Sequence, residues 1–139
     1  MDLKFMFFRT NWINLLGIFT AVYIYGIITA LSQVSTFNDL GNSLIWGFLG
    51  SFIGIIVFGF YFWLGFITIM FILDLILLNM NRKYLLRKLF LEWVIVSSPF
   101  IYSDIKYNNW VFFVAVAGFL VAQWYRAKAI GKIIAWYEY

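Results

Sequence analysis

Two carboxylates inside apolar stretches are the residues of this sequence best suited to do chemistry. Asp74 and Glu92 lie nine residues before and nine residues after Lys83. If the chain forms an antiparallel helical hairpin that turns near Lys83, the two side chains reach a similar depth and can face each other. Two carboxylates that meet in a partly desolvated site can share a proton or hold a cation. Asp74 and Glu92 are therefore our candidate ion or proton pair.

The same two carboxylates also have a simpler interpretation, as members of structural ion pairs. Glu92 follows Lys88 by one helical turn, and Asp74 precedes Arg82 and Arg87. Asp74 could instead pair with a residue of another subunit. We favour ion pairing, because structural ion pairs explain such residues more often than proton relays do. The sequence leaves both interpretations open.

Missing residue types exclude most other chemistry within the chain. The sequence contains no cysteine and no histidine, which excludes thiolate nucleophiles, iron–sulfur clusters, histidine-ligated metals and a histidine general base. No nucleotide-binding loop, nucleophile elbow, zinc-protease or calcium-loop motif occurs. We predict no catalytic residue, no metal site, no cofactor and no enzymatic activity.

The elements that must position these residues are helices in a membrane. Of the 139 residues, 65% are hydrophobic and 12% are charged, and the mean hydropathy is +0.92. Soluble domains carry about 25% charged residues, and a helix that crosses a membrane needs about 20 apolar residues. We predict one all-α membrane domain over residues 1–139. Its four transmembrane helices are expected at about residues 12–34, 52–78, 85–102 and 110–125.

The distribution of positive charge predicts how these helices are oriented. Nine of the ten lysines and arginines lie before the first helix, between the second and third helices or in the first turn of the third, or after the fourth; the exception is Lys106. Short cytoplasmic loops retain positive residues, so we expect both termini on the cytoplasmic side. The abundance of residues with AT-rich codons points to a bacterial inner membrane, or alternatively to an organellar inner membrane with both termini in the matrix.

The stretch from Ser43 to Met80 fits either one long helix or two short spans. It carries a single charge, Asp74, and as one straight helix it would be about 57 Å long. A split near residues 59–65 would move a group of positive charges to the wrong side of the membrane. We therefore predict one tilted or kinked span, with residues 43–50 as an extracytoplasmic extension.

Small residues at helical spacing mark the faces on which we expect helices to pack. Helices in lipid approach closely where glycine and alanine share a face. Packing within the four-helix bundle is the favoured interpretation, and self-association or docking to a partner is the alternative. The predicted packing residues are Gly47, Gly50, Gly54, Gly118 and Ala122.

Residues 126–139 are predicted to form an amphipathic helix that lies on the cytoplasmic membrane surface. Ile130, Ile133 and Ile134 recur at helical spacing, while the neighbouring lysines point elsewhere. Contact of this helix with lipid is favoured over docking to a partner protein. No nucleic-acid-binding motif accompanies the basic residues, so we predict no nucleic-acid partner. The residues expected to contact anionic lipid headgroups are Arg82, Lys83, Arg87, Lys88, Arg126, Lys128 and Lys132.

Taken with the lack of a self-sufficient catalytic set, these features predict a non-catalytic integral subunit of a larger membrane complex. Such a subunit would pack against partner transmembrane subunits and stabilise them. The alternative is a small homo-oligomeric ion or proton channel, or a carrier, that uses Asp74 and Glu92.

Overall fold

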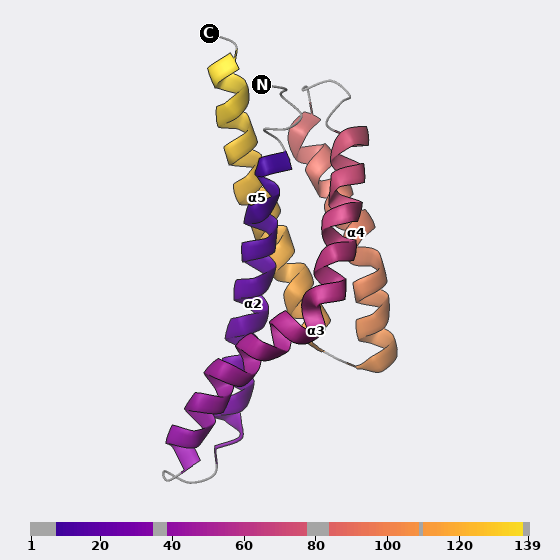
Figure 1. Cartoon of the computed structure of the whole chain (residues 1–139). Helices are drawn as coiled ribbons and strands as arrows, with labels where there is room; N and C mark the ends of the chain where they lie inside the picture. Colours follow the sequence, from indigo (N-terminus) through magenta and orange to yellow (C-terminus); the bar gives the residue numbers. More distant parts are fainter. Residues whose placement is uncertain (1–7, 35–38, 78–83, 109, 138–139) are drawn as a thin grey trace.

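The computed structural model describes residues 8–34, 39–77, 84–108 and 110–137, except for the side chains of residues 58, 61 and 137. The fold is all-α. Its helices are α2 (Asn11–Ser32), α3 (Leu40–Leu77), α4 (Leu85–Tyr107) and α5 (Trp110–Tyr137) (Figure 1). The predicted starts of the third and fourth transmembrane helices agree with those of α4 and α5.

Three helices of the described chain are long and apolar enough to cross a membrane, which supports the expectation of an integral membrane protein. They are Asn11–Ser32 in α2, Leu40–Val57 in α3 and Trp110–Trp136 in α5, and Phe62–Leu77, also part of α3, is a shorter apolar stretch. Helix α4 is not among them, because three or more charged residues fall in every 18-residue stretch of it.

The helices form a bundle from which one hairpin projects. Helix α2 packs against α5 and α3, and α4 packs mainly against α5. The C-terminal part of α2 and the N-terminal part of α3 run together past the connection between α4 and α5 (Figure 1). We call residues 26–32 of α2 and residues 40–51 of α3 the hairpin tip, and the remainder of the four helices the bundle.

Helix α3 is one continuous helix of 38 residues that bends near its middle (Figure 1). It begins at Leu40, so the predicted extension and span are parts of one helix. Glycine is a common cause of a helix bend, and Gly59 lies in the middle of α3. The indole of Trp63 lies against Gly59, where an added Cβ would come within 2.7 Å of the indole nitrogen. That nitrogen donates a hydrogen bond of 3.4 Å to the carbonyl of Ile55.

Helix α4 continues beyond its predicted end at residue 102, through Pro99, to Tyr107. Proline lacks an N–H group, so it leaves a carbonyl of the preceding turn without its helical donor. The helix accommodates this loss and still continues. It ends where Asn108 adopts the left-handed conformation, with a φ of 49°, which asparagine tolerates better than most residues do.

The predicted surface helix over residues 126–139 is wrong, because α5 runs without interruption from Trp110 to Tyr137. Its isoleucines pack against other residues of the chain. Ile130 is fully buried and packs with Leu89 of α4 and Ala127, and Ile133 and Ile134 pack against the same cluster. The apolar residues of this segment do share one face of the helix, but that face packs against α4.

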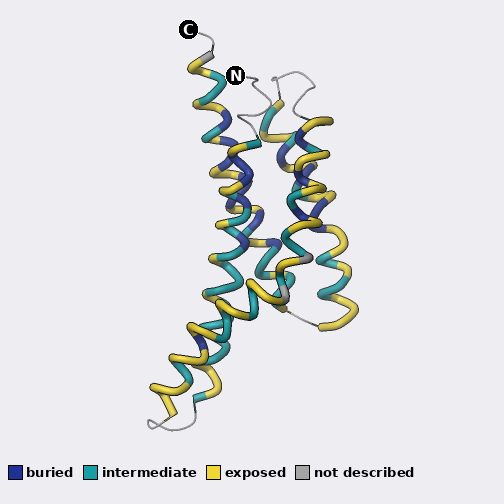
Figure 2. Tube along the Cα trace, viewed as in Figure 1, coloured by how far each residue is buried: buried dark blue, intermediate teal, exposed yellow. Residues whose placement is uncertain are grey.

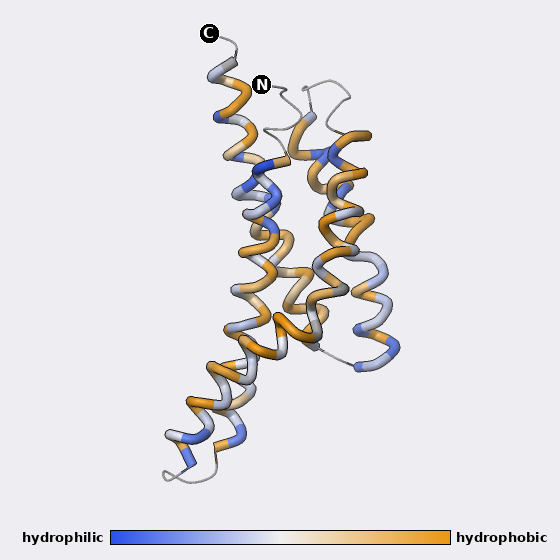
Figure 3. The backbone as a smooth tube through the Cα atoms, viewed as in Figure 1, coloured by the Kyte–Doolittle hydropathy of each residue, from blue (hydrophilic) through white to orange (hydrophobic). Residues whose placement is uncertain are grey.

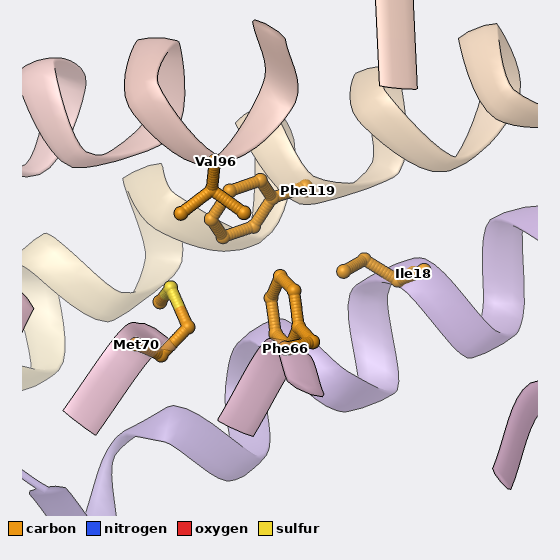
Figure 4. Close-up of a cluster of buried hydrophobic side chains, with 5 residues drawn as sticks. All are labelled: Ile18, Phe66, Met70, Val96 and Phe119. Carbon is orange, nitrogen blue, oxygen red and sulfur yellow. The ribbon is translucent and has the colours of Figure 1, made fainter. Parts of the chain in front are cut away.

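All four helices contribute to the main hydrophobic core, which lies inside the bundle (Figure 4). Buried residues gather in the bundle, whereas the hairpin tip is mostly half-buried or exposed (Figure 2). Edge-to-face contact between Phe66 and Phe119, with centroids 5.2 Å apart, links α3 to α5. The buried core residues are Ile18, Phe66, Met70, Val96 and Phe119.

Glycine and alanine bring α2 and α5 into close contact. A Cβ on Gly17 would lie 2.5 Å from the Cβ of Ala122, and a Cβ on Gly118 would lie 2.5 Å from the Cβ of Ala21. Real Cβ atoms do not approach so closely, so neither glycine can be replaced without moving a helix. The predicted packing residues Gly118 and Ala122 thus lie at the α2–α5 contact.

The predicted packing residues of α3 divide into two groups. Gly47 lies against α2, where an added Cβ would be 3.0 Å from the Cβ of Ala30. A Cβ on Gly50 would meet only Trp46 of its own helix, and one on Gly54 would meet open space. The GxxxG pair of Gly50 and Gly54 therefore does not bring α3 against another described helix.

Candidate functional site

A buried arginine joins the four helices at the end of the bundle where α2 and α4 begin and α3 ends. The side chain of Arg126, in α5, is 0% exposed. Hydrophilic residues gather at the start of α2 and on the neighbouring turns of α5 (Figure 3). Burial of a guanidinium is costly unless each of its donors finds a partner, and the surrounding helices supply those partners.

Asp74 of α3 receives two hydrogen bonds from one guanidinium nitrogen. Arg126 Nη2 lies 2.7 Å from both Oδ1 and Oδ2 of Asp74. Asn11 of α2 donates a third bond, from Nδ2 to Oδ2, at 2.6 Å. Asn14, one turn further along α2, donates to Asn11 Oδ1 at 3.1 Å and so helps to fix the amide of Asn11. Asp74 is thus held by α5 and α2 together.

Glu92 of α4 binds a different nitrogen of the same guanidinium. Arg126 Nη1 lies 3.1 Å from Oε1 and 3.3 Å from Oε2 of Glu92. The remaining nitrogen, Nε, donates to Thr10 Oγ1 at 2.9 Å. Thr10 precedes α2, and its hydroxyl does not cap that helix. Every nitrogen of the Arg126 guanidinium therefore donates a hydrogen bond, and the partners lie on three other segments of the chain.

The structure brings Asp74 and Glu92 to one place, as their symmetric spacing about Lys83 suggests. They do not face each other as a free pair, since Arg126 lies between them and binds both. Glu92 is 1% exposed and Asp74 is 7% exposed. Both carboxylates are thus engaged and shielded, which suits a structural lock better than a path for ions or protons. We call Thr10, Asn11, Asp74, Glu92 and Arg126 the arginine cluster.

The assignment of Arg126 to the lipid headgroups was wrong, because its side chain is buried. Both carboxylates form ion pairs, as the favoured interpretation expects, but their described partner is Arg126; the expected partner Arg82 lies outside the described residues. Arg126 follows Trp124 and Tyr125, aromatic residues typical of a membrane interface, and its partners lie 34 and 52 residues away in the sequence. One signal could have revealed its position. Arg126 falls on the same helical stripe as the buried residues Phe119, Ala122 and Ile130.

The other predicted headgroup residues have different environments. Arg87, Lys128 and Lys132 are exposed, and Lys88 is half-buried. Arg82 and Lys83 lie outside the described residues. Within the described part of the chain, no group of three or more histidine, cysteine, aspartate or glutamate side chains is placed to hold a metal ion.

Comparison with known proteins gives no match to a family model, to a curated protein or to a solved structure.

Proposed function

We propose that this protein is a non-catalytic integral membrane subunit that stabilises a larger complex through its hairpin tip. The observation that carries the proposal is the position of the tip relative to the polar ends of α4 and α5. A partner protein explains that position better than lipid alone does.

Aromatic and charged residues mark two polar levels on the α4–α5 pair. At one end, Tyr84, Trp124 and Lys128 are exposed; at the other, Lys106 and Trp110 are exposed. Such residues concentrate at the two surfaces of a membrane. Trp110 and Trp124 are separated by about 21 Å along α5, so this stretch of α5 can cross most of the hydrocarbon layer.

The hairpin tip extends past the second of these levels and is nevertheless apolar. The C-terminal part of α2 and the N-terminal part of α3 run past the α4–α5 connection (Figure 1). Among the residues of the hairpin tip, Ile28, Ile45 and Trp46 are 59%, 58% and 66% exposed. Large exposed apolar patches generally mark contacts with a protein or a membrane. Because the tip lies beyond the surface that α4 and α5 define, we infer that the transmembrane or extracytoplasmic part of another subunit covers it.

The orientation and the membrane are also part of the proposal. The excess of positive residues beside the N-terminal and C-terminal helices supports a cytoplasmic location for both termini. The tip would then face the extracytoplasmic side, in a bacterial inner membrane or its organellar counterpart. The arginine cluster would lie near the cytoplasmic side and hold the four helices in register.

Site-specific crosslinking tests the proposal directly, because the chain has no cysteine of its own. We would introduce Ile45→Cys at the tip and, as a matched control, Ile95→Cys on the exposed face of α4. A thiol-linked photocrosslinker in native membranes should join the tip variant to one distinct polypeptide and the control to none. The same crosslink from both positions, or none from the tip, would contradict a tip-specific partner.

Native purification separates this function from a channel. Extraction of the tagged chain in mild detergent should yield a particle with a second polypeptide in fixed ratio. A particle made only of copies of this chain, with proton or cation flux in liposomes that Asp74→Asn and Glu92→Gln abolish, would overturn the proposal in favour of a channel or carrier.

A further inference from the structure

The outer face of the α4–α5 pair carries two adjoining hollows that are not part of the arginine cluster. One has a volume of about 700 Å³ and the other about 550 Å³. They share Leu86, Arg87 and Trp124 as lining residues, so together they form one groove along the two helices. We call this the α4–α5 groove.

The two ends of the groove differ in chemistry. The larger hollow is lined mainly by apolar and aromatic side chains, among them Phe90, Trp93 and Val121. The smaller hollow has two exposed cations, Arg87 of α4 and Lys128 of α5. One groove therefore offers a long apolar wall that ends in two positive charges from different helices.

Aromatic rings hold both cations at the mouth of the groove. The Arg87 guanidinium carbon lies 5.1 Å from the ring centre of Tyr84, and Lys128 Nζ lies 4.2 Å from that of Trp124. Cations stacked on aromatic faces are attracted by the ring electrons and keep their charge. In the described structure neither cation has a carboxylate in ion-pair contact, so both are available to an anion.

We propose that the α4–α5 groove binds a phospholipid with an anionic headgroup. Its phosphate contacts Arg87 and Lys128, and an acyl chain lies along Phe90, Trp93 and Val121. In this site only two of the exposed cations, Arg87 and Lys128, contact the lipid, and the apolar lining contacts its acyl chain. A general attraction of anionic lipids to surface lysines would involve all of the exposed cations equally. It requires a membrane environment but no partner subunit.

Native mass spectrometry of the purified chain tests the site, with phosphatidylglycerol as the anionic probe and phosphatidylcholine as the zwitterionic one. The wild-type protein should retain one phosphatidylglycerol in preference to phosphatidylcholine. Arg87→Gln with Lys128→Gln should weaken phosphatidylglycerol binding about thirtyfold, from the usual contribution of two cations near an anionic lipid. The matched control, Lys106→Gln with Lys132→Gln, removes the same charge from positions outside the groove and should change binding less than threefold.

A second variant tests the apolar part of the groove. Val121 is exposed to the groove, and Val121→Trp should fill it and weaken phosphatidylglycerol binding at unchanged net charge. An unchanged thermal unfolding temperature for each variant separates loss of the site from loss of the fold. Equal binding of the two lipids, equal effects of the two charge-removing pairs, or no effect of Val121→Trp would each overturn the proposal. Because the assay uses the isolated chain, its result is independent of whether the hairpin tip has a partner.

Discussion

The helices of the bundle and those of the hairpin tip are held together by different kinds of contact. In the bundle, a buried guanidinium makes hydrogen bonds to residues of α3, α4 and the start of α2, above an apolar core from four helices. In the tip, two helices meet through small residues such as Gly47 and Ala30, and large apolar side chains remain exposed. In a membrane the hydrophobic effect does not drive helices together, so polar contacts and close packing must stabilise their association. The bundle uses both, whereas the described residues of the two tip helices meet by close packing, and the outer surface of the tip remains exposed.

The largest expected effect comes from breaking the polar contacts of the bundle. Arg126→Leu leaves Asp74 and Glu92 buried without their cation, which typically costs about 3–5 kcal/mol. We expect a correspondingly large loss of stability in detergent, measured by thermal or SDS-induced unfolding. Lys132→Leu, at an exposed position of the same helix, should change stability by less than about 0.5 kcal/mol. Equal stability of the Arg126→Leu variant and wild type would show that the cluster does not hold the bundle together.

Removing the whole cluster sharpens this test. The combined change Asp74→Leu, Glu92→Met and Arg126→Met removes every charge and leaves apolar side chains of comparable size. Such replacements are often neutral or even stabilising, so the triple variant should be more stable than Arg126→Leu alone. A triple variant as unstable as the single one would mean that size and shape, rather than unpaired charge, dominate at this position.

The second-largest effect should come from the contact between α2 and α5. Gly118→Val places branched carbon atoms where even a Cβ would lie 2.5 Å from Ala21, so the helices must separate. Overpacking of this kind typically costs about 1–3 kcal/mol. Unfolding in detergent should detect the loss. Ala117→Val, which introduces the same side chain at the neighbouring exposed position of α5, is the control, and a similar loss there would show that the close contact is not the cause.

Loss of the amide that supports Asp74 should have a moderate effect. Asn11→Leu removes the bond of 2.6 Å to Oδ2 but leaves Arg126 in place. A hydrogen bond to a charged group contributes about 1.5–3 kcal/mol, and the remaining guanidinium contacts should keep the loss near the lower value. A loss as large as that of Arg126→Leu would mean that Asn11, rather than the guanidinium, is the main partner of the carboxylate. The measurement is again unfolding in detergent.

The smallest effect on the isolated chain should be found beside the tip, and it gives the sharpest contrast with the bundle. Gly54→Leu points into open space, so the unfolding of the purified chain should change by less than about 0.5 kcal/mol. A large loss of stability in the isolated chain would instead place Gly54 in an intramolecular contact.

The candidate site was only partly predictable from the sequence. Asp74 and Glu92 stand out because charges are rare in apolar helices, and their equal distances from Lys83 suggest that they meet. Arg126 was missed because it follows two interfacial aromatic residues and resembles the basic residues after it. Arg126 differs from those basic residues because it lies on the same helical stripe as Phe119, Ala122 and Ile130. Burial of an arginine on such a stripe can be predicted only when a carboxylate is known to face it.

The sequence by itself determined the helical, membrane-compatible character of this protein, because the length and apolar composition of a segment decide whether it forms a helix suited to lipid. The starts of α4 and α5 follow from local pattern for the same reason. Only the tertiary structure decided what each polar or small residue contacts. Ile130 is covered by α4, Arg126 is buried within the chain, and Gly54 is open where Gly118 is packed. These outcomes depend on helices that are distant in the sequence, and helical periodicity marks a face of a helix without specifying what covers it.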